Sequence, residues 1–332
     1  MDLRNLREIK KFAAQRLEQS PSQQQIVLIY AGLALGMTAL MTVLNYVLGL
    51  QIDNYGGLSN LSKRTMLSTF QSMLPMAQSL ITMCLNLGYL AAMLRIARGM
   101  YTSPQTLRLG FDRFWLLLRC SIFRGLILAG ALLVAMYAGI LIFAVSPFSG
   151  PAMEIITPLV SQVSILDTGL VIDDATYNQL VVAMLPCFAI CGILMLVLAA
   201  PVYYSYRMVD YVIIDKPAMG ALMALRESKK MMRGNRMKLL KLDISIWWYY
   251  LASAAATVIG YGDMLLPMLG VELPMSETVG FFIFCGLYLL ANFGILYFLR
   301  NRAEVCYALA YAAVKPEEKQ DSGVVLGNIF QM

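Results

Sequence analysis

Two carboxylates, Asp210 and Asp263, are the side chains whose type and setting best suit chemistry. Asp263 closes the tetrapeptide Gly260-Tyr261-Gly262-Asp263, and Asp210 is the candidate for a second acid. Two carboxylates that lie about 3 Å apart share a single proton and can work as an acid and a base. This chemistry therefore depends on whether the surrounding elements bring the two residues together.

Other catalytic groups are scarce, because the 332 residues contain no histidine. This excludes Ser-His-Asp and Cys-His catalysis and any metal site built on histidine. Of the six cysteines, Cys187 and Cys191 are four residues apart on one helix face, without a third ligand nearby, which favours packing over metal binding. We therefore expect a protein that is not an enzyme, without catalytic residues, cofactor or bound metal.

The elements that position these residues are long apolar runs. The chain is 59% apolar and 14% charged, with a mean hydropathy of +0.66, against about 45–50% and about 25% in soluble proteins. A membrane-spanning helix needs about 20 apolar residues. Six runs qualify, and they are continuous rather than alternating, which excludes a β-barrel. The predicted fold is an all-α polytopic membrane protein with six transmembrane helices plus amphipathic interfacial helices. The expected spans are residues 26–50, 73–94, 125–146, 180–206, 244–262 and 279–299.

The distribution of basic residues predicts the orientation. Residues 1–25, 95–124, 207–241 and 300–332 together hold 24 of the 26 lysines and arginines. We expect the protein to lie in the plasma membrane. Because basic residues accumulate in cytoplasmic loops, both termini are expected in the cytoplasm.

This orientation separates the two carboxylates. Asp210 then follows the inner end of the fourth span and Asp263 the outer end of the fifth, roughly the 30 Å hydrocarbon thickness apart. The G-x-G-D pattern is also found in intramembrane aspartyl proteases, but their P-A-L motif is absent here. We interpret residues 260–263 as a glycine-rich turn that leaves the membrane.

The six spans contain no Asp, Glu, Lys or Arg, which argues against a proton relay or a buried ion-pair gate. Asn86 and Asn292 lie in the inner halves of their spans. We expect them to make hydrogen bonds between packed helices, and the alternative is a role as substrate ligands.

Segments outside the spans carry further predictions. Residues 1–25 place Leu3, Leu6, Ile9, Phe12, Ala13 and Leu17 on one helical stripe, typical of an amphipathic helix on the cytoplasmic face. Residues 26–314 form the transmembrane domain, and residues 315–332 a cytoplasmic tail. Residues 147–179 have no basic residue and are expected to form an interfacial, re-entrant or capping element.

The most distinctive cytoplasmic segment is residues 207–241. Asp215 is expected to cap a helix over residues 218–233, which Gly234 ends. Basic residues form one stripe of this helix and continue beyond it: Arg226, Lys229, Lys230, Arg233, Arg236 and Lys238. The stripe is either a topology signal or a docking site for anionic lipid or a membrane-protein partner. Its apolar companions and the lack of a recognition motif exclude nucleic acid.

The order of features over residues 201–247 resembles a known family. Pro201, the tyrosines at 203–211 and Asp215-x-Pro217 precede Ala224-Leu225-x-x-Ser228, Met231-Met232-x-Gly234-Asn235 and Leu242-Asp243-Ile244-Ser245. This pattern is similar to the bacterial integral membrane family called domain of unknown function 975, which implies six spans. More distantly, the chain resembles the membrane domain of bacterial glycerophosphodiester phosphodiesterases. Neither resemblance implies catalytic residues.

These observations favour an accessory or scaffold membrane protein whose basic interfacial helices contact anionic lipid or a partner. The alternative is a transporter or exporter of a small solute, lipid or peptide, for which the prolines at 75, 186 and 201 would kink helices around a cavity.

Overall fold

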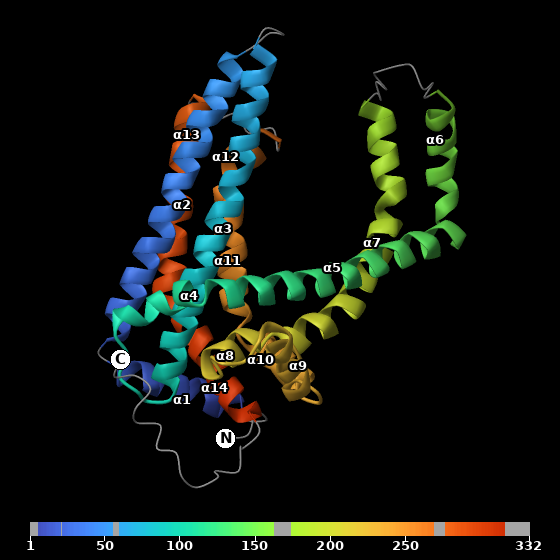
Figure 1. Cartoon of the computed structure of the whole chain (residues 1–332). Helices are drawn as coiled ribbons and strands as arrows, with labels where there is room; N and C mark the ends of the chain where they lie inside the picture. Colours follow the sequence, from blue (N-terminus) through green and yellow to red (C-terminus); the bar gives the residue numbers. More distant parts are fainter. Residues whose placement is uncertain (1–5, 21, 56–59, 163–173, 269–275, 316–332) are drawn as a thin grey trace. The chain divides into compact units, whose positions relative to one another are not determined.

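The computed structural model describes residues 6–20, 22–55, 60–162, 174–268 and 276–315, and the elements in these ranges are helices, without a strand (Figure 1). The predicted all-α class is confirmed. The chain divides into unit 1, Met1–Leu118 with Met208–Met332, and unit 2, Arg119–Arg207. Each unit is described by itself below.

Several helices are long and apolar enough to cross a membrane. Within the described ranges there are five, or six if one bent pair counts as a single span. The five are Gln23–Asn54, Leu61–Ala97, Phe114–Val145, Gln179–Asp215 and Thr278–Val314, and the bent pair is α10 (Arg236–Ser245) with α11 (Trp247–Gly260). These lengths and compositions are those of a polytopic membrane protein.

The fifth span, expected over residues 244–262, begins in the structure at the end of α10 and continues as α11. The axes of α10 and α11 meet at 62°, and Ile246 lies between them, almost fully buried. The sequence suggests the reason: α10 carries three basic side chains, which are costly in an apolar layer, whereas α11 carries no charged residue.

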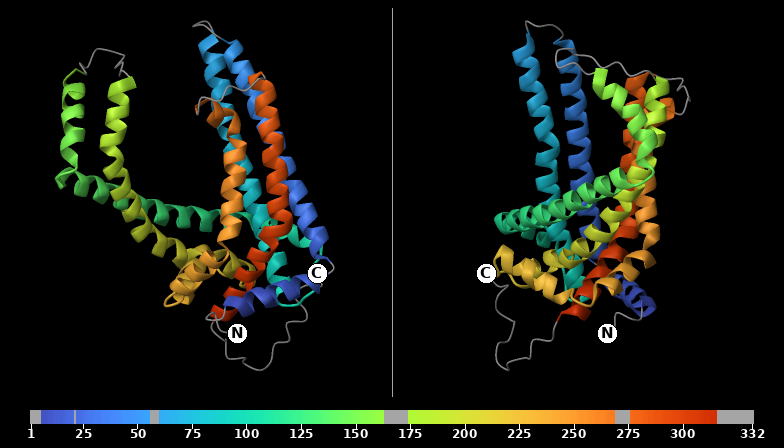
Figure 2. Two further views of the ribbon diagram at one scale, coloured as in Figure 1. Left: turned by 180° about the vertical axis from the view of Figure 1, so that it is seen from behind. Right: turned by 90° about the vertical axis from the view of Figure 1, so that its right-hand side faces the viewer.

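Unit 1 is built around α3 (Leu61–Ala97). It runs beside α2 (Gln23–Asn54), and α11 and α13 (Glu277–Gly294) lie next to this pair (Figures 1 and 2). The residues of α3 from Leu85 to Ala97 are almost all buried, because the short helices η2 (Pro104–Arg108), α4 (Leu109–Asp112) and α8 (Val209–Asp215) pack around them, together with α14 (Asn301–Val314). The core therefore lies at one end of the bundle.

Two glycines allow the chain to cross α3 at very short range. A Cβ atom on Gly88 would lie 2.2 Å from the carbonyl oxygen of Leu107, and one on Gly110 would lie 1.8 Å from that of Cys84. Both distances are far below van der Waals contact, so only glycine fits at these positions. The two contacts fix η2 and α4 against the buried half of α3.

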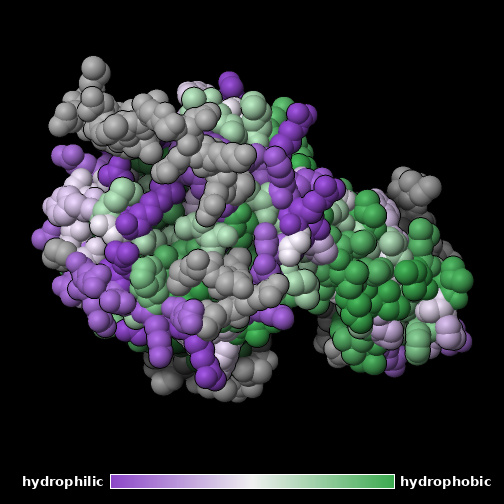
Figure 3. Space-filling view, turned by 90° about the horizontal axis from the view of Figure 1, so that it is seen from below, coloured by the Kyte–Doolittle hydropathy of each residue, from purple (hydrophilic) through white to green (hydrophobic). Residues whose placement is uncertain are grey.

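The helix α1 (Leu6–Glu18) lies at the same end of unit 1. Its buried side chains are Ile9, Ala13 and Leu17, and it packs on α14 and α3. Its apolar face is thus covered by protein, where a membrane surface was expected, while Leu3 of the predicted stripe lies outside the described residues. We call the end of unit 1 that holds α1, α9 (Ala221–Met231), α10 and α14 the basic end (Figure 1); hydrophilic side chains gather on it (Figure 3).

Unit 2 contains most of α5 (Phe114–Val145), with α6 (Ser149–Gln162) and α7 (Asp174–Tyr206). Its small core consists of Phe143, Ala152, Cys187 and Cys191, so both cysteines pack as expected. The predicted element over residues 147–179 begins as α6, which packs on α7; residues 163–173 lie outside the described part, as do residues 316–332 of the predicted tail.

Candidate functional site

One face of a single helix organises the polar groups at the basic end. The helix α13 continues without a break through the π-helical turn η3 (Ile295–Arg300) into α14. Four polar residues of this continuous helix, and a fifth directly after its end, are spaced by three or four positions and fall on one stripe, because 3.6 residues make one turn. We call Arg300, Glu304, Tyr307, Tyr311 and Lys315 the α14 stripe.

Arg300 is the first residue of this stripe and is largely buried. Its Nη1 donates a hydrogen bond of 2.8 Å to the hydroxyl of Tyr30, and its Nη2 donates to Oδ1 of Asn86. The guanidinium carbon lies 5.1 and 5.3 Å from the ring centroids of Tyr30 and Tyr89, which stack on each other at 4.3 Å. Glu304 lies 3.6 Å away. Planar hydrogen bonding combined with cation–π contact is a combination that lysine does not reproduce.

The carboxylates of the basic end accept hydrogen bonds from the stripe. The Tyr307 hydroxyl donates to Asp243 at 2.6 Å, and the Tyr311 hydroxyl donates to Asp215 at 3.1 Å. Lys315 also reaches Asp215, at 2.7 Å. These contacts join α10 and α8 to α14.

Three further contacts complete this network. Arg98, at the end of α3, lies 2.8 Å from Asp215. Tyr211 of α8 donates to Glu304 at 3.4 Å and stacks on Tyr311. Glu304, Asp215 and Asp243 are thus each neutralised or hydrogen-bonded, so these acids act as ties between helices rather than as free bases.

A second arginine joins the core to α8. Nη1 of Arg113, which follows α4, donates to the carbonyl oxygen of Ile213, and burial lowers the pKa of the Arg113 guanidinium. Guanidinium groups nevertheless stay protonated in proteins. Arg113 therefore remains a fixed positive charge between α4 and α8.

The sequence interpretation missed the α14 stripe and assigned a different role to Asp215. We expected the sixth span to end before Arg300 and Asp215 to cap the following helix. In the structure Asp215 ends α8, and Gly220 is the N-cap of α9. The signal that would have found the stripe is the spacing of its polar residues, which recur every three or four positions from Arg300 to Lys315.

The predicted basic residues of α9 lie on its outer face. Ala221, Ala224, Leu225, Ser228 and Met231 are buried against the protein. The exposed side chains lie on the opposite face or directly after the helix, and two of them are apolar: Leu222, Met223, Arg226, Lys229, Lys230 and, beyond Met231, Arg233. None of these four basic side chains forms an ion pair with the part of the chain that is described. Gly234 has φ +84 and ends this segment.

The other predicted residues lie in different settings. Arg236 begins α10, where its Nε is buried, and Lys238 is half-buried in the same helix. Asn86 accepts the hydrogen bond from Arg300 described above. Asn292 donates instead to the carbonyl oxygen of Tyr288 in its own helix. Asn86 therefore makes a hydrogen bond between helices, whereas the hydrogen bond of Asn292 stays within α13.

The candidate carboxylate pair does not assemble either. Asp210 lies in α8 and Asp263 in α12 (Gly262–Met268), at opposite ends of unit 1 (Figure 1). The glycines beside Asp263 have a packing role: a Cβ on Gly262 would lie 2.5 Å from the Phe284 ring of α13. Among the described residues, no group of three or more acids, cysteines or histidines is arranged to hold a metal ion.

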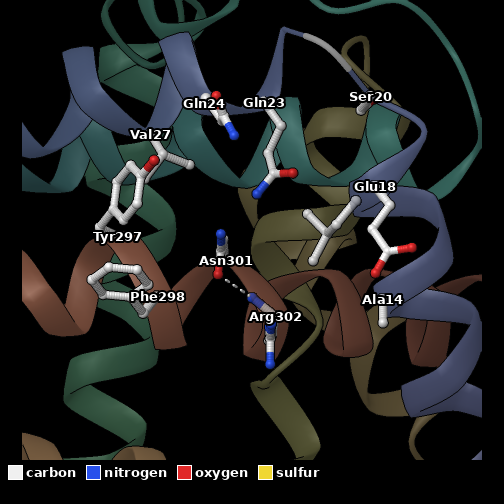
Figure 4. A pocket seen from close by; sticks show the side chains of 11 residues that line it. Ala14, Glu18, Ser20, Gln23, Gln24, Val27, Tyr297, Phe298, Asn301 and Arg302 are labelled. Carbon is white, nitrogen blue, oxygen red and sulfur yellow. Dashed lines mark hydrogen bonds between the residues drawn. The ribbon is translucent and has the colours of Figure 1, made fainter.

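A cavity of about 510 Å³ opens at the basic end (Figure 4). The end of α1, the start of α2 and the junction of η3 with α14 form its walls. Polar and apolar side chains share the lining, which consists of Ala14, Leu17, Glu18, Ser20, Gln23, Gln24, Val27, Tyr297, Phe298, Asn301 and Arg302.

Comparison with known proteins supports the family resemblance that the sequence shows over residues 201–247. No curated protein and no solved structure matches this chain, and the more distant similarity to the membrane domain of glycerophosphodiester phosphodiesterases is not shown. The model of the family described as "Protein of unknown function (DUF975)" matches residues 1–315. In the structure, three residues of the segment 201–247 form hydrogen bonds with the α14 stripe: Tyr211, Asp215 and Asp243. The chain is a member of this DUF975 family.

Proposed function

We propose that this protein is a non-enzymatic accessory or scaffold protein of a bacterial plasma membrane. In this proposal both termini and the basic end face the cytoplasm, and the outer face of α9 contacts the headgroups of anionic lipids. The observation that carries the proposal is the composition of that face. It combines the exposed apolar side chains of Leu222 and Met223 with four exposed basic side chains.

This combination suits a membrane surface better than water. Apolar side chains at one end of the face enter the boundary of the acyl chains, while lysine and arginine extend to the phosphates. The inner face of α9 already packs on protein through Ala224 and Leu225, which fixes the direction of the outer face. Each basic residue near an anionic surface contributes about 1 kcal/mol, so four contribute about 4 kcal/mol, roughly a thousandfold in lipid partitioning.

The test is purification in native lipid patches, followed by lipidomics and proteomics on one sample. Changing Arg226, Lys229, Lys230 and Arg233 to Gln should reduce the anionic lipid that accompanies the protein. A matched control changes Lys63 and Arg64, both exposed at the start of α3, to Gln and should leave the lipid ratio unchanged. A second variant with Leu222→Ser and Met223→Ser tests the apolar contribution.

Two outcomes would contradict lipid contact by α9. An unchanged lipid ratio in the four-Gln variant would reduce the stripe to a topology signal. Loss of a stoichiometric protein partner, with lipid unchanged, would assign the face to that partner.

Transport of a small solute, lipid or peptide is the second candidate, and the cavity in Figure 4 is the observation that favours it. Counterflow of a labelled substrate into proteoliposomes would support transport, whereas an accessory protein gives no flux.

A further inference from the structure

The cavity at the basic end carries two opposite charges. Glu18 comes from α1 and Arg302 from α14, and both line the same space (Figure 4). Neither side chain forms an ion pair or a hydrogen bond with the part of the chain that is described. Two unpaired, opposite charges around one cavity favour a ligand that carries both charges itself.

Amide groups complete the polar lining. The side chain of Asn301 is nearly buried, and its Oδ1 accepts the backbone N–H of Arg302 at 2.7 Å. That bond fixes the orientation of the amide, so its nitrogen points into the cavity (Figure 4). Gln23 offers a second amide from the start of α2. Asn301 and Gln23 therefore present amide donors to the same cavity that Arg302 lines.

The ends of the candidate spans place the cavity at the level expected for lipid headgroups. Gln23 begins the candidate span Gln23–Asn54, and Arg302 follows Thr278, the start of another span, by about the 20 residues that cross the hydrocarbon layer. Next to the polar groups, Phe298 is 63% exposed and Val27 is buried in the wall. One side of the cavity is thus apolar and the other polar, as an amphiphile requires.

We propose that this cavity binds the headgroup of an aminophospholipid, with the ammonium group at Glu18 and the phosphate at Arg302 and the amide of Asn301. The acyl chains then leave along Phe298. Glu18 disfavours lipids with only negative charge, and it needs N–H donors that a quaternary ammonium group lacks. A cavity of about 510 Å³ lies within the usual range of roughly 300–1,000 Å³ for small-ligand sites. This proposal does not rest on the role of α9.

The test is native mass spectrometry of the full-length protein with three lipids of identical acyl chains. The probes are phosphatidylethanolamine, phosphatidylcholine and phosphatidylglycerol. The wild type should bind phosphatidylethanolamine at least about tenfold more tightly than the other two, the effect of one charge-assisted hydrogen bond. Equal binding of the three lipids would overturn the proposal.

Substitutions of Glu18 and Arg302 test whether these two charges cause the preference for phosphatidylethanolamine. Arg302→Gln should weaken phosphatidylethanolamine binding about tenfold. Glu18→Gln should weaken it too, while binding of phosphatidylglycerol rises because the repulsion is gone. The control, Arg7→Gln with Glu8→Gln on the exposed side of α1, should behave as the wild type. Lipid selectivity that is unchanged in Glu18→Gln would overturn the assignment.

Two further experiments are needed. The first distinguishes a membrane lipid from a soluble ligand, and the second distinguishes this proposal from the one for α9. Free glycerophosphoethanolamine that competes as well as the lipid would overturn a membrane source and point to a soluble zwitterion. The four-Gln variant of α9 should keep its preference for phosphatidylethanolamine, so failure at α9 and failure at the cavity are distinguishable.

Discussion

The hydroxyl of Tyr307 donates a 2.6 Å hydrogen bond to the carboxylate of Asp243, which lies 64 residues earlier in the chain. Both side chains are buried, and the Tyr250 hydroxyl lies 2.8 Å from that of Tyr307. Three helices, α10, α11 and α14, therefore meet at one small polar cluster at the basic end. Because buried polar groups are costly when unpaired, this cluster specifies how the three helices fit.

Removing this hydrogen bond should destabilise unit 1. We expect Tyr307→Phe to lower the free energy of unfolding by about 1–3 kcal/mol, because the Asp243 carboxylate loses a charge-assisted partner. Titration with a denaturing detergent measures the change. Tyr101→Phe is the matched control, since Tyr101 is 79% exposed. An equal effect of both variants would contradict a structural role for this contact.

Arg300 should tolerate no conservative change. Lysine keeps the charge, but it loses the planar pair of bonds to Tyr30 and Asn86 and fits poorly between the tyrosine rings. We expect Arg300→Lys to cost about 2–4 kcal/mol in the same unfolding assay. The exposed Arg108, changed to Lys, should cost little. If the two substitutions had similar small effects, the buried network would not contribute to stability.

Gly110 should not accept even one methyl group. Alanine there places its Cβ 1.8 Å from the carbonyl oxygen of Cys84, which only a shift of the backbone relieves. We expect Gly110→Ala to cost about 3 kcal/mol or more, measured as the yield of folded protein in gel filtration and by detergent unfolding. Gly125→Ala is the control, because a Cβ on Gly125 in α5 meets nothing within 4 Å. That variant should be stabilising by up to about 1 kcal/mol, since alanine favours helices.

The proposed orientation can be tested by labelling. Lys230→Cys on α9 should react with a membrane-impermeant maleimide only after cells are opened, whereas Lys63→Cys should react in intact cells. The native cysteines in the described part of the chain are buried or half-buried, which keeps the background low. Labelling of Lys230→Cys in intact cells would reverse the orientation.

The sequence predicted well those features that depend on local composition. Apolar runs of about 20 residues identified the helices, and the spacing around Ala224 and Arg226 identified the two faces of α9. Hydropathy has no comparable signal for a buried charge. Arg300 therefore marked the end of a span, although tyrosine rings and an amide enclose it in the folded chain.

Long-range pairing explains the other differences from the sequence predictions. Asp215 precedes Lys216-Pro217, a local pattern typical of a helix cap, but its partners Arg98 and Lys315 lie about 100 residues away in either direction. The covered face of α1 has the same origin, since Ile9 and Ala13 have an apolar spacing that suits lipid and protein equally well. Only the fold decides which of the two surfaces covers them.

The uninterrupted helix from Thr278 to Val314 has a mechanical consequence. Its 37 residues extend over about 55 Å, roughly twice the hydrocarbon thickness. One part of a helix this long can cross the bilayer, while the remaining part extends beyond it and carries the α14 stripe. Tilting by about 10°, as a change in bilayer thickness imposes, displaces the far end by about 10 Å relative to the near end. Such a displacement would pull on the hydrogen bonds of Tyr307 and Tyr311 to their carboxylates.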